Sequence, residues 1–316
     1  MGLIVDNLVK TYGEKTVVDH LSFSMDKPGV YALLGTNGAG KTTSIRMILG
    51  MLLKDEGTVT FNGQELSTDT INIGYLAEER GLYPKVSLID QMQYFALLKK
   101  VPKKEINKRI RYWAERLNLM EYFYPEPVIK RGKKTKAKPF RADQLSKGNQ
   151  QKVQLMATLI SDPDIIVLDE PLSGLDPVNT DLFKDIIHEI ASQNKYIIMS
   201  SHQMATIEEF CTDITILDKG NVVLQGNLDE IKKGYGRVNL ILKTEEDVKH
   251  IISELNLKIC EENADSIMIK LSKEEEAKVL LRRLVEENIT VIRFELAEPS
   301  LHEIFVEKVG QVNEEE

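Results

Sequence analysis

The sequence predicts an α/β protein built on a parallel sheet, followed by a second and smaller α+β domain. Three observations support this fold class. A glycine-rich loop stands between an apolar stretch, residues 30–34, and a helix beginning near Lys41. A second apolar stretch, residues 165–168, ends in two carboxylates, as expected of a strand buried on both faces of a parallel sheet. After Gly236 the pattern changes to strands and helices in the order βαββαβ.

The glycine-rich loop has the pattern Gly-x-x-x-x-Gly-Lys-Thr. It consists of Gly35, Thr36, Asn37, Gly38, Ala39, Gly40, Lys41, Thr42 and Thr43. Glycines without a Cβ let the backbone curl around phosphates, so that consecutive N–H groups and a helix N-terminus point at one anion. Lys41 adds a positive charge, and Thr42 offers a hydroxyl to Mg²⁺. The loop therefore predicts a site for a nucleoside triphosphate.

The two carboxylates after residues 165–168 are Asp169 and Glu170. They emerge at the carboxyl end of the predicted strand, which is the edge where parallel sheets bind ligands. We expect Asp169 to hold Mg²⁺ directly or through water. We expect Glu170 to accept a proton from the attacking water or to orient that water.

The octapeptide Leu145–Lys152 precedes a helical pattern of apolar residues, and Ser146 is predicted to cap that helix. Alone, a serine and a glycine indicate no more than a helix start. The glycine loop, this octapeptide, the acidic strand and a later histidine, His202, nevertheless follow one another in the order of a known family. The chain resembles the nucleotide-binding subunit of ATP-binding cassette (ABC) transporters, which implies ATP and Mg²⁺ as cofactors.

The resemblance covers the whole chain and implies roles for single residues. Tyr12 matches the aromatic residue on which the family stacks adenine, and His202 matches the switch histidine that contacts the γ-phosphate. Asp176, in the segment 173–177, matches the loop that crosses the dimer interface. Without the family, Tyr12 would be interpreted as an edge-strand aromatic, His202 as a structural histidine and the segment 173–177 as a polar turn.

The family's signature loop is matched at Leu145, Ser146 and Gly148. Lys147 and Asn149 depart from its commonest form. In the family this loop caps the γ-phosphate of ATP that the opposite subunit holds. The resemblance therefore implies that residues 146–148 bind the nucleotide of a partner chain, in a homodimer or in a heterodimer with a second ATPase subunit.

Glu78 is a departure with mechanistic weight, because the family usually has a Mg²⁺-contacting glutamine at this position. A carboxylate is also a hard oxygen ligand, so Glu78 is a candidate metal ligand. The alternative is that Glu78 faces solvent and that Thr42, Asp169 and water serve the ion. The sequence leaves both open.

The domain order follows from the pattern and from the resemblance. Residues 1–236 are expected to form the nucleotide-binding domain, with a RecA-like core, an antiparallel β subdomain and a helical insert at about 82–145. Gly234, Tyr235 and Gly236 punctuate the chain. Residues 237–309 predict a ferredoxin-like accessory domain, and residues 310–316 a frayed acidic tail.

The accessory domain resembles the appendage of bacterial ABC proteins that export drugs, bacteriocins or ions. Its two helices are predicted to start at capping boxes, Thr244 with Asp247 and Ser272 with Glu275. It carries no convincing catalytic cluster. We expect it to serve homodimer contact or regulation.

Length and composition agree with a soluble enzyme subunit. The chain has 316 residues, 42% hydrophobic and 28% charged, and contains no run of about eighteen apolar residues. No secretory leader is recognisable, so the cytoplasmic face of the membrane is the expected location. Cys211 and Cys260 are expected to be reduced packing residues. The net charge of −8 offers no general attraction for nucleic acid.

A basic stretch lies inside the helical insert, before the signature loop. It contains Lys130, Arg131, Lys133, Lys134, Lys136, Lys138 and Arg141. The first interpretation is a solvated, mobile loop, and the second is contact with anionic lipid headgroups. Nucleic-acid binding is less favoured, because no aromatic residues are interleaved for base stacking.

The resemblance implies an ATPase that dimerises on ATP and drives a separate integral membrane permease, by export rather than import. One alternative is a soluble ABC ATPase that acts on nucleic acid or ribosomes, although the chain has one cassette and no sustained heptads. Another is a nucleotide-gated interaction module without turnover, against which Glu170 and His202 weigh. The sequence does not identify a cargo.

Overall fold

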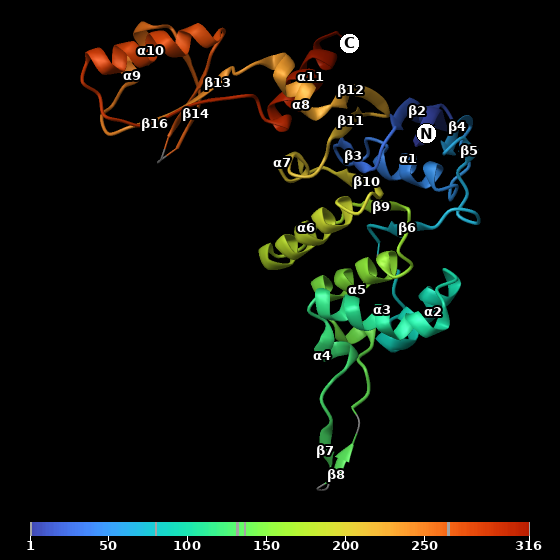
Figure 1. The fold of residues 1–316 in the computed structure, drawn as a ribbon. Coiled ribbons are helices and arrows are strands. Elements are labelled where there is room, and N and C mark those ends of the chain that lie inside the picture. The colour runs from blue at the N-terminus through green and yellow to red at the C-terminus, as the bar shows by residue number, and fades with distance from the viewer. Residues whose placement is uncertain (1, 80, 131–132, 136, 264–265, 316) are drawn as a thin grey trace. The chain divides into compact units, whose positions relative to one another are not determined.

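The structure is a computed structural model that describes residues 2–79, 81–130, 133–135, 137–263 and 266–315 (Figure 1). The chain divides into two compact units, residues 1–225 and 226–316. The division lies before the glycine pair that the sequence analysis used as a boundary. The reason is that helix α8 (Leu228–Tyr235) belongs to the second unit rather than closing the first.

The first unit is organised by a six-stranded sheet in the order β12-β11-β3-β10-β9-β6. Its strands are β3 (Gly29–Gly35), β6 (Ile73–Leu76), β9 (Ile165–Asp169), β10 (Tyr196–Ser201), β11 (Asp213–Asp218) and β12 (Asn221–Asn227). The pairings of β3, β6, β9, β10 and β11 are parallel. As predicted, β9 is buried along its whole length. Because the strands are parallel, the carboxyl ends of β3, β9 and β10 meet at one edge.

Helix α1 (Lys41–Ile48) follows β3, and α6 (Pro177–Ala191) and α7 (Met204–Ile207) follow β9 and β10. A second, antiparallel sheet has the order β2-β1-β4-β5. Its strands are β1 (Leu3–Tyr12), β2 (Lys15–Met25), β4 (Glu56–Phe61) and β5 (Gln64–Glu65). One apolar core joins both sheets and α1, and it includes Leu3, Ile45 and Val167. This shared core fixes α1, and with it the glycine loop, against the sheet.

The helical insert contains α2 (Leu88–Leu98), α3 (Lys103–Arg116), α4 (Met120–Phe123), the 3₁₀ turn η1 (Ala142–Gln144) and α5 (Lys147–Leu159). Ser87 caps α2 by accepting a hydrogen bond from the Asp90 N–H at 3.2 Å, as its spacing predicts. No described helix is long and apolar enough to span a bilayer.

The basic stretch is not only a loop. It contains an antiparallel hairpin of β7 (Val128–Lys130) and β8 (Lys133–Thr135), visible in Figure 1. Three pairs of residues face each other across this ladder, from Val128–Thr135 to Lys130–Lys133. Strand pairing gives hydrogen-bond partners to backbone groups that a loop would leave to water. The polarity of the side chains alone does not predict this pairing. Arg131 and Lys136 lie outside the described residues.

The second unit has the predicted βαββαβ order. Its elements are β13 (Asn239–Thr244), α9 (Lys249–Glu254), β14 (Lys258–Glu262), β15 (Ile267–Lys270), α10 (Glu274–Glu286) and β16 (Val291–Ala297). The strands form an antiparallel sheet in the order β14-β15-β13-β16. The core of this unit includes Leu240 and Ile269 from the sheet and Ile251 and Leu280 from the helices. The final helix α11 (Leu301–Glu315) includes residues 310–315, where the sequence analysis expects a frayed tail.

Two local expectations in this unit are wrong. Neither α9 nor α10 has a side-chain cap, so the two proposed capping boxes do not form. Instead, Thr244 Oγ1 donates to the Glu246 carbonyl at 2.8 Å, and the Ser272 N–H donates to Glu276 Oε2 at 2.8 Å. Neither cysteine forms a disulfide; Cys211 is buried, but Cys260 is exposed on β14 and is not a packing residue.

Candidate nucleotide-binding site

The glycine loop joins β3 to α1 with backbone angles that only glycine adopts readily. Gly38 and Gly40 have φ values of +84° and +103°. A Cβ added to Gly40 would lie 2.6 Å from the Val17 carbonyl oxygen, so a side chain there would displace the neighbouring strand. A Cβ added to Gly38 would meet no atom within 4 Å, because this part of the loop faces open space.

Lys41 closes the loop on itself. Its Nζ donates to the carbonyl oxygens of Gly35 at 2.8 Å and Thr36 at 3.1 Å. The side chain is only 6% exposed, and Glu170 Oε1 lies 3.4 Å from Nζ. The ammonium group is therefore held at the base of the loop, where a phosphate cradled by the loop would meet it.

Glu170 follows β9 in the left-handed backbone region, at φ +49°. Such a conformation is costly for a non-glycine residue, and it occurs here where the carboxylate lies next to Lys41 of the loop. Glu170 Oε2 lies 2.8 Å from His202 Nδ1. Glu170 Oε1 is buried and accepts no hydrogen bond from the described residues. The structure therefore brings Glu170, His202 and Lys41 into one cluster.

Asp169 is held by two hydroxyl groups. Its Oδ1 accepts hydrogen bonds from Ser200 Oγ at 2.5 Å and Thr42 Oγ1 at 3.3 Å. Its Oδ2 is buried without a hydrogen-bond partner in the part of the chain that the structure describes. A buried, unpaired carboxylate oxygen beside a threonine hydroxyl has the chemistry of a partial Mg²⁺ site.

Ser200 is a site residue that sequence reasoning missed. Besides donating to Asp169, its Oγ accepts a hydrogen bond from the Glu170 N–H at 3.0 Å. It therefore positions both carboxylates at once. Ser200 reaches the site because the register of β10 on β9 pairs it with Asp169. This register cannot be read from the sequence, so no sequence pattern could have identified Ser200.

A cavity of about 330 Å³ lies over this cluster. Its lining consists of Val17, Asn37, Gly38, Gly40, Lys41, Thr42, Thr43, Glu78 and Glu170. These residues supply backbone donors, one ammonium group and carboxylates, which fits a phosphate chain with a bound cation. Among the described residues, no three acidic, histidine or cysteine side chains are arranged to hold a metal. A cation here would take its other ligands from nucleotide and water.

Tyr12, at the end of β1, does not belong to that lining. Its side chain is 53% exposed, and the Lys10 ammonium group lies 5.5 Å from its ring centroid. An exposed ring at a strand end is free to stack on a planar ligand.

The signature loop also lies apart from this lining. Ser146 caps α5, as predicted, by accepting a hydrogen bond from the Asn149 N–H at 3.3 Å. Lys147 begins α5, and Gly148 follows it. A Cβ on Gly148 would lie 3.0 Å from Asn179 Nδ2, so this glycine is packed against the start of α6.

Asp176 caps α6. Its Oδ1 accepts from the Asn179 N–H at 3.0 Å and its Oδ2 from Asn179 Nδ2 at 2.5 Å. Hydrogen bonds from Asn179 lower the pKa of Asp176. Asn179, which the sequence analysis did not single out, thus links Asp176 to the signature glycine.

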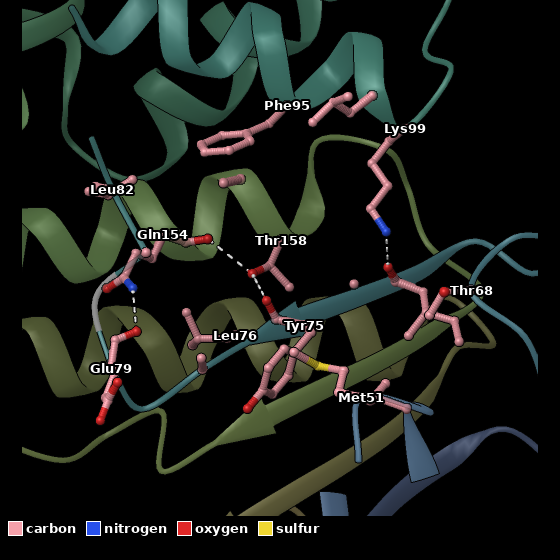
Figure 2. A pocket seen from close by; sticks show the side chains of 17 residues that line it. Met51, Thr68, Tyr75, Leu76, Glu79, Leu82, Phe95, Lys99, Gln154 and Thr158 are labelled. Carbon is pink, nitrogen blue, oxygen red and sulfur yellow. Dashed lines mark hydrogen bonds between the residues drawn. The ribbon is translucent and has the colours of Figure 1, made fainter. Parts of the chain in front are cut away.

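Strand β6 and the residues after it connect the site to the helical insert. Gln154 Nε2 donates to the Glu79 carbonyl at 3.2 Å, and Thr158 Oγ1 donates to the Tyr75 carbonyl at 3.2 Å. A mainly apolar cavity of about 450 Å³ adjoins these contacts, with Phe95 and Lys99 on the side of α2 and Met51 on the side of the sheet (Figure 2). Burial lowers the pKa of Lys99, whose Nζ donates to the Ile73 carbonyl at 2.8 Å.

Comparison with known proteins gives consistent results. Residues 18–173 match the family described as ABC transporter, and residues 226–309 match the C-terminal domain of DrrA1-3-like ATP-binding proteins. The uncharacterized ABC transporter ATP-binding protein YhaQ of Bacillus subtilis (strain 168) is 39% identical over 313 residues, covering 99% of this chain and 100% of that protein. The Nod factor export ATP-binding protein I of Ralstonia nicotianae is 34% identical over 233 residues, covering 72% of this chain and 68% of that protein. A solved structure of an ATP binding subunit of an ABC transporter aligns with a TM-score of 0.64 and 26% identity, covering 81% of this chain and 100% of that one.

The fold and the phosphate-binding loop define a nucleoside triphosphatase of the α/β class, and the comparisons identify the family within that class. The chain belongs to the family of ABC transporter ATP-binding proteins, whose ATP hydrolysis is coupled to transport. The resemblance inferred from the motifs is thereby confirmed.

Proposed function

We propose that two protomers close on ATP and Mg²⁺ and that each active site is shared between them. The observation that carries this proposal is the separation of the two halves within one chain. The cluster of Lys41, Glu170 and His202 lines or adjoins the phosphate cavity, whereas Ser146 and Gly148 do not line it. A second protomer, a copy or a related ATPase subunit, supplies the missing signature corner.

Each residue in the shared site has a chemical task. The loop Gly35–Thr43 and Lys41 bind the phosphates, and Tyr12 stacks on adenine. Thr42 and Asp169 would hold Mg²⁺, which when bound would neutralise phosphate charge. Glu170 accepts the proton of the attacking water, and His202 orients Glu170 and contacts the γ-phosphate. Residues 146–148 and Asp176 act from across the interface.

Glu78 is proposed as a further Mg²⁺ ligand. Its support is its place in the lining of the phosphate cavity, beside Thr42. A carboxylate there suits a hard cation that keeps several waters. The alternative of a merely solvent-facing Glu78 is tested in the Discussion.

The partner that receives the motion is a separate integral membrane subunit. Support comes from the apolar cavity of Figure 2, whose lining includes the exposed side chains of Met51 and Leu98, 63% and 60% exposed. An apolar segment of a membrane subunit that bound in this cavity would contact Gln154 and Thr158, whose side chains donate hydrogen bonds to the backbone of segment 75–79. Closure over ATP would then be transmitted through α5 and the helical insert.

Export is the proposed direction, because a relative named for Nod factor export shares 34% identity with this chain. The proposed location is the cytoplasmic face of the membrane, as a peripheral subunit. Contact of the basic 130–141 segment with anionic lipid belongs to the same proposal. The reported relatives are named for transport, and none is named for nucleic acid or ribosomes.

A complementation experiment tests the shared site. Lys41→Ala and Gly148→Asp chains should each be inactive alone. In a mixed dimer, one site carries both defects and the other has an intact Lys41 and an intact Gly148, so mixing should restore ATP hydrolysis. Mixing Lys41→Ala with Glu170→Gln is the control. Both residues belong to the phosphate-loop half of a site, so in the mixed dimer each site carries one defect and no intact site forms. Equal inactivity of both mixtures would refute the shared site.

A further inference from the structure

A second polar cavity, of about 640 Å³, lies in the helical insert away from the phosphate loop. Three cations line it: Lys85, Lys138 and Arg141. One carboxylate, that of Asp90, also belongs to the lining, and it accepts a hydrogen bond from Ser87 Oγ at 2.5 Å. The cavity therefore has an excess of positive charge in a chain whose net charge is −8.

The fold builds this cavity from two distant segments. The Leu88 N–H donates to the Phe140 carbonyl at 2.9 Å, and the Asp143 N–H donates to the Pro84 carbonyl at 3.0 Å. Ser87 and Arg141 form an antiparallel bridge between the same segments. Backbone contacts thus hold Lys85 beside a basic stretch that follows it by more than forty residues in the sequence. The sequence alone gave no reason to include Lys85.

Most of this charge is uncompensated. In the described parts of the chain, neither Lys85 nor Lys138 has an ion-pair partner, while Arg141 Nε contacts Asp143 Oδ1 at 3.1 Å. Residues 128–141 contain seven Lys or Arg and no Asp or Glu. A local field of this sign attracts a phosphate group.

The rest of the wall selects the kind of phosphate. The half-buried side chains of Ile89 and Phe140 line the same cavity, so an occupant would meet charge and apolar surface together. Free inorganic phosphate uses only the charge. A phospholipid headgroup presents a phosphate followed by glycerol and the first acyl carbons, which matches both parts of the wall.

We propose that this cavity binds the phosphate of an anionic phospholipid, with Lys85, Lys138 and Arg141 as its cationic contacts. The inference rests on the proposed function in one respect, namely that the chain works beside a membrane. The inference replaces contact through the whole basic segment by one defined site, which includes Lys85. The role of this site would be to hold the helical insert at the headgroup layer of the membrane.

The test is co-sedimentation of the full chain with phosphatidylcholine vesicles, with and without phosphatidylglycerol, in the absence of nucleotide. The test variant is Lys85→Gln with Lys138→Gln. The matched control is Lys104→Gln with Lys108→Gln, which removes the same charge from exposed positions on α3 of the same insert. Binding should fall by about fivefold for each cavity lysine removed, and far less for the control. Unchanged ATP hydrolysis and thermal midpoint in both variants would show that the fold and the nucleotide site are intact.

Three results would overturn the inference. Equal losses in the cavity variant and the control would indicate diffuse surface charge, and equal binding to both vesicle types would exclude an anionic headgroup. Titration with inorganic phosphate and with glycerol phosphate is the third arm. If either compound binds in a way that depends on Lys85, and the chain does not bind vesicles, the site would be assigned to a soluble phosphate. Because none of the binding measurements needs nucleotide, failure here and failure of the shared ATP site are separate results.

Discussion

His202 Nδ1 lies 2.8 Å from Glu170 Oε2, joining the end of β10 to the residue after β9. The other oxygen of the same carboxylate lies 3.4 Å from Lys41 Nζ. Glu170 is therefore fixed from both sides, and its left-handed backbone conformation adds to this fixation. Oε1, the oxygen near Lys41, accepts no hydrogen bond from the described residues, so under the proposed function it is the oxygen open to the attacking water.

Glu170→Gln should bind ATP but hydrolyse it slower by about 10²-fold or more, because the amide cannot accept the proton. ATP should then trap the closed dimer. Steady-state hydrolysis and size-exclusion chromatography with ATP and Mg²⁺ measure both effects. A variant that stays monomeric with ATP and turns over normally would remove Glu170 from the role of base.

Ser200→Ala should lower both stability and turnover. It deletes the donor to Asp169 and leaves the buried Glu170 N–H without an acceptor, at a cost of about 1–3 kcal/mol. Ser201→Ala is the matched control, because Ser201 Oγ accepts only from the Gln203 N–H in the described contacts. Urea unfolding and hydrolysis rates should separate the two variants; indistinguishable losses would contradict the positioning role.

The contrast between Lys41 and Ser200 shows what the sequence could predict. Lys41 and Asp169 stand in local patterns, a glycine loop and an apolar run, whose chemistry is readable along the chain. Ser200 is placed beside Asp169 by strand register, and Asn179 and Lys85 are placed by packing between distant segments. None of these three has a local pattern.

The elements show the same division. Strand β9 and helix α5 were predictable, because a continuous apolar run marks a buried strand and apolar residues at helical spacing mark a helix. The hairpin β7–β8 was missed, because a lysine-rich stretch lacks the apolar alternation that marks a strand. The capping box expected at the start of α10 does not form, and the Ser272 N–H donates to Glu276 rather than to Glu275.

Glu78→Gln should raise the Mg²⁺ concentration needed for half-maximal hydrolysis by about tenfold, if the carboxylate is a ligand. Glutamine keeps the size and one oxygen but loses the charge. Titration of hydrolysis with Mg²⁺ at saturating ATP measures the change, and Glu79→Gln is the neighbouring control. Superimposable curves for Glu78→Gln and the unchanged chain would show that Thr42, Asp169 and water suffice.

Gly148→Ala should have little net effect on stability, because two effects oppose each other. Alanine in the first turn of α5 gains about 0.5–1 kcal/mol over glycine, but its Cβ would press on Asn179 Nδ2 at 3.0 Å. In an Asn179→Ala background the pressure disappears, so the same substitution should become stabilising by that amount. Chemical unfolding of the four chains of this double-mutant cycle gives the coupling. Zero coupling would show that the packing contact has no energetic consequence.

The last prediction concerns the accessory domain and its dependence on pH. Glu303 on α11 is bound by Asn239 of β13, whose Nδ2 lies 2.9 and 3.0 Å from its two oxygens. Burial alone would raise the pKa of Glu303, but hydrogen bonds from Ser300 and Asn239 and the charge of Lys270 lower it below its ordinary value of 4.5. The sign follows from linkage: a depressed carboxyl pKa stabilises the folded state above the unfolded value, and this stabilisation is lost as pH falls through the folded value.

Glu303→Gln should therefore lower the thermal midpoint of the accessory domain at pH 7 and have a shrinking effect as the pH falls below 4.5. Glu307→Gln, an exposed position on the same helix, is the control for loss of one negative charge. Thermal unfolding of the full chain across this range measures the difference between the two variants. If both lose the same stability at every pH, the contact with Asn239 does not anchor α11 to the sheet. If only Glu303→Gln shows the pH-dependent loss, the carboxylate is the group that holds this helix in place.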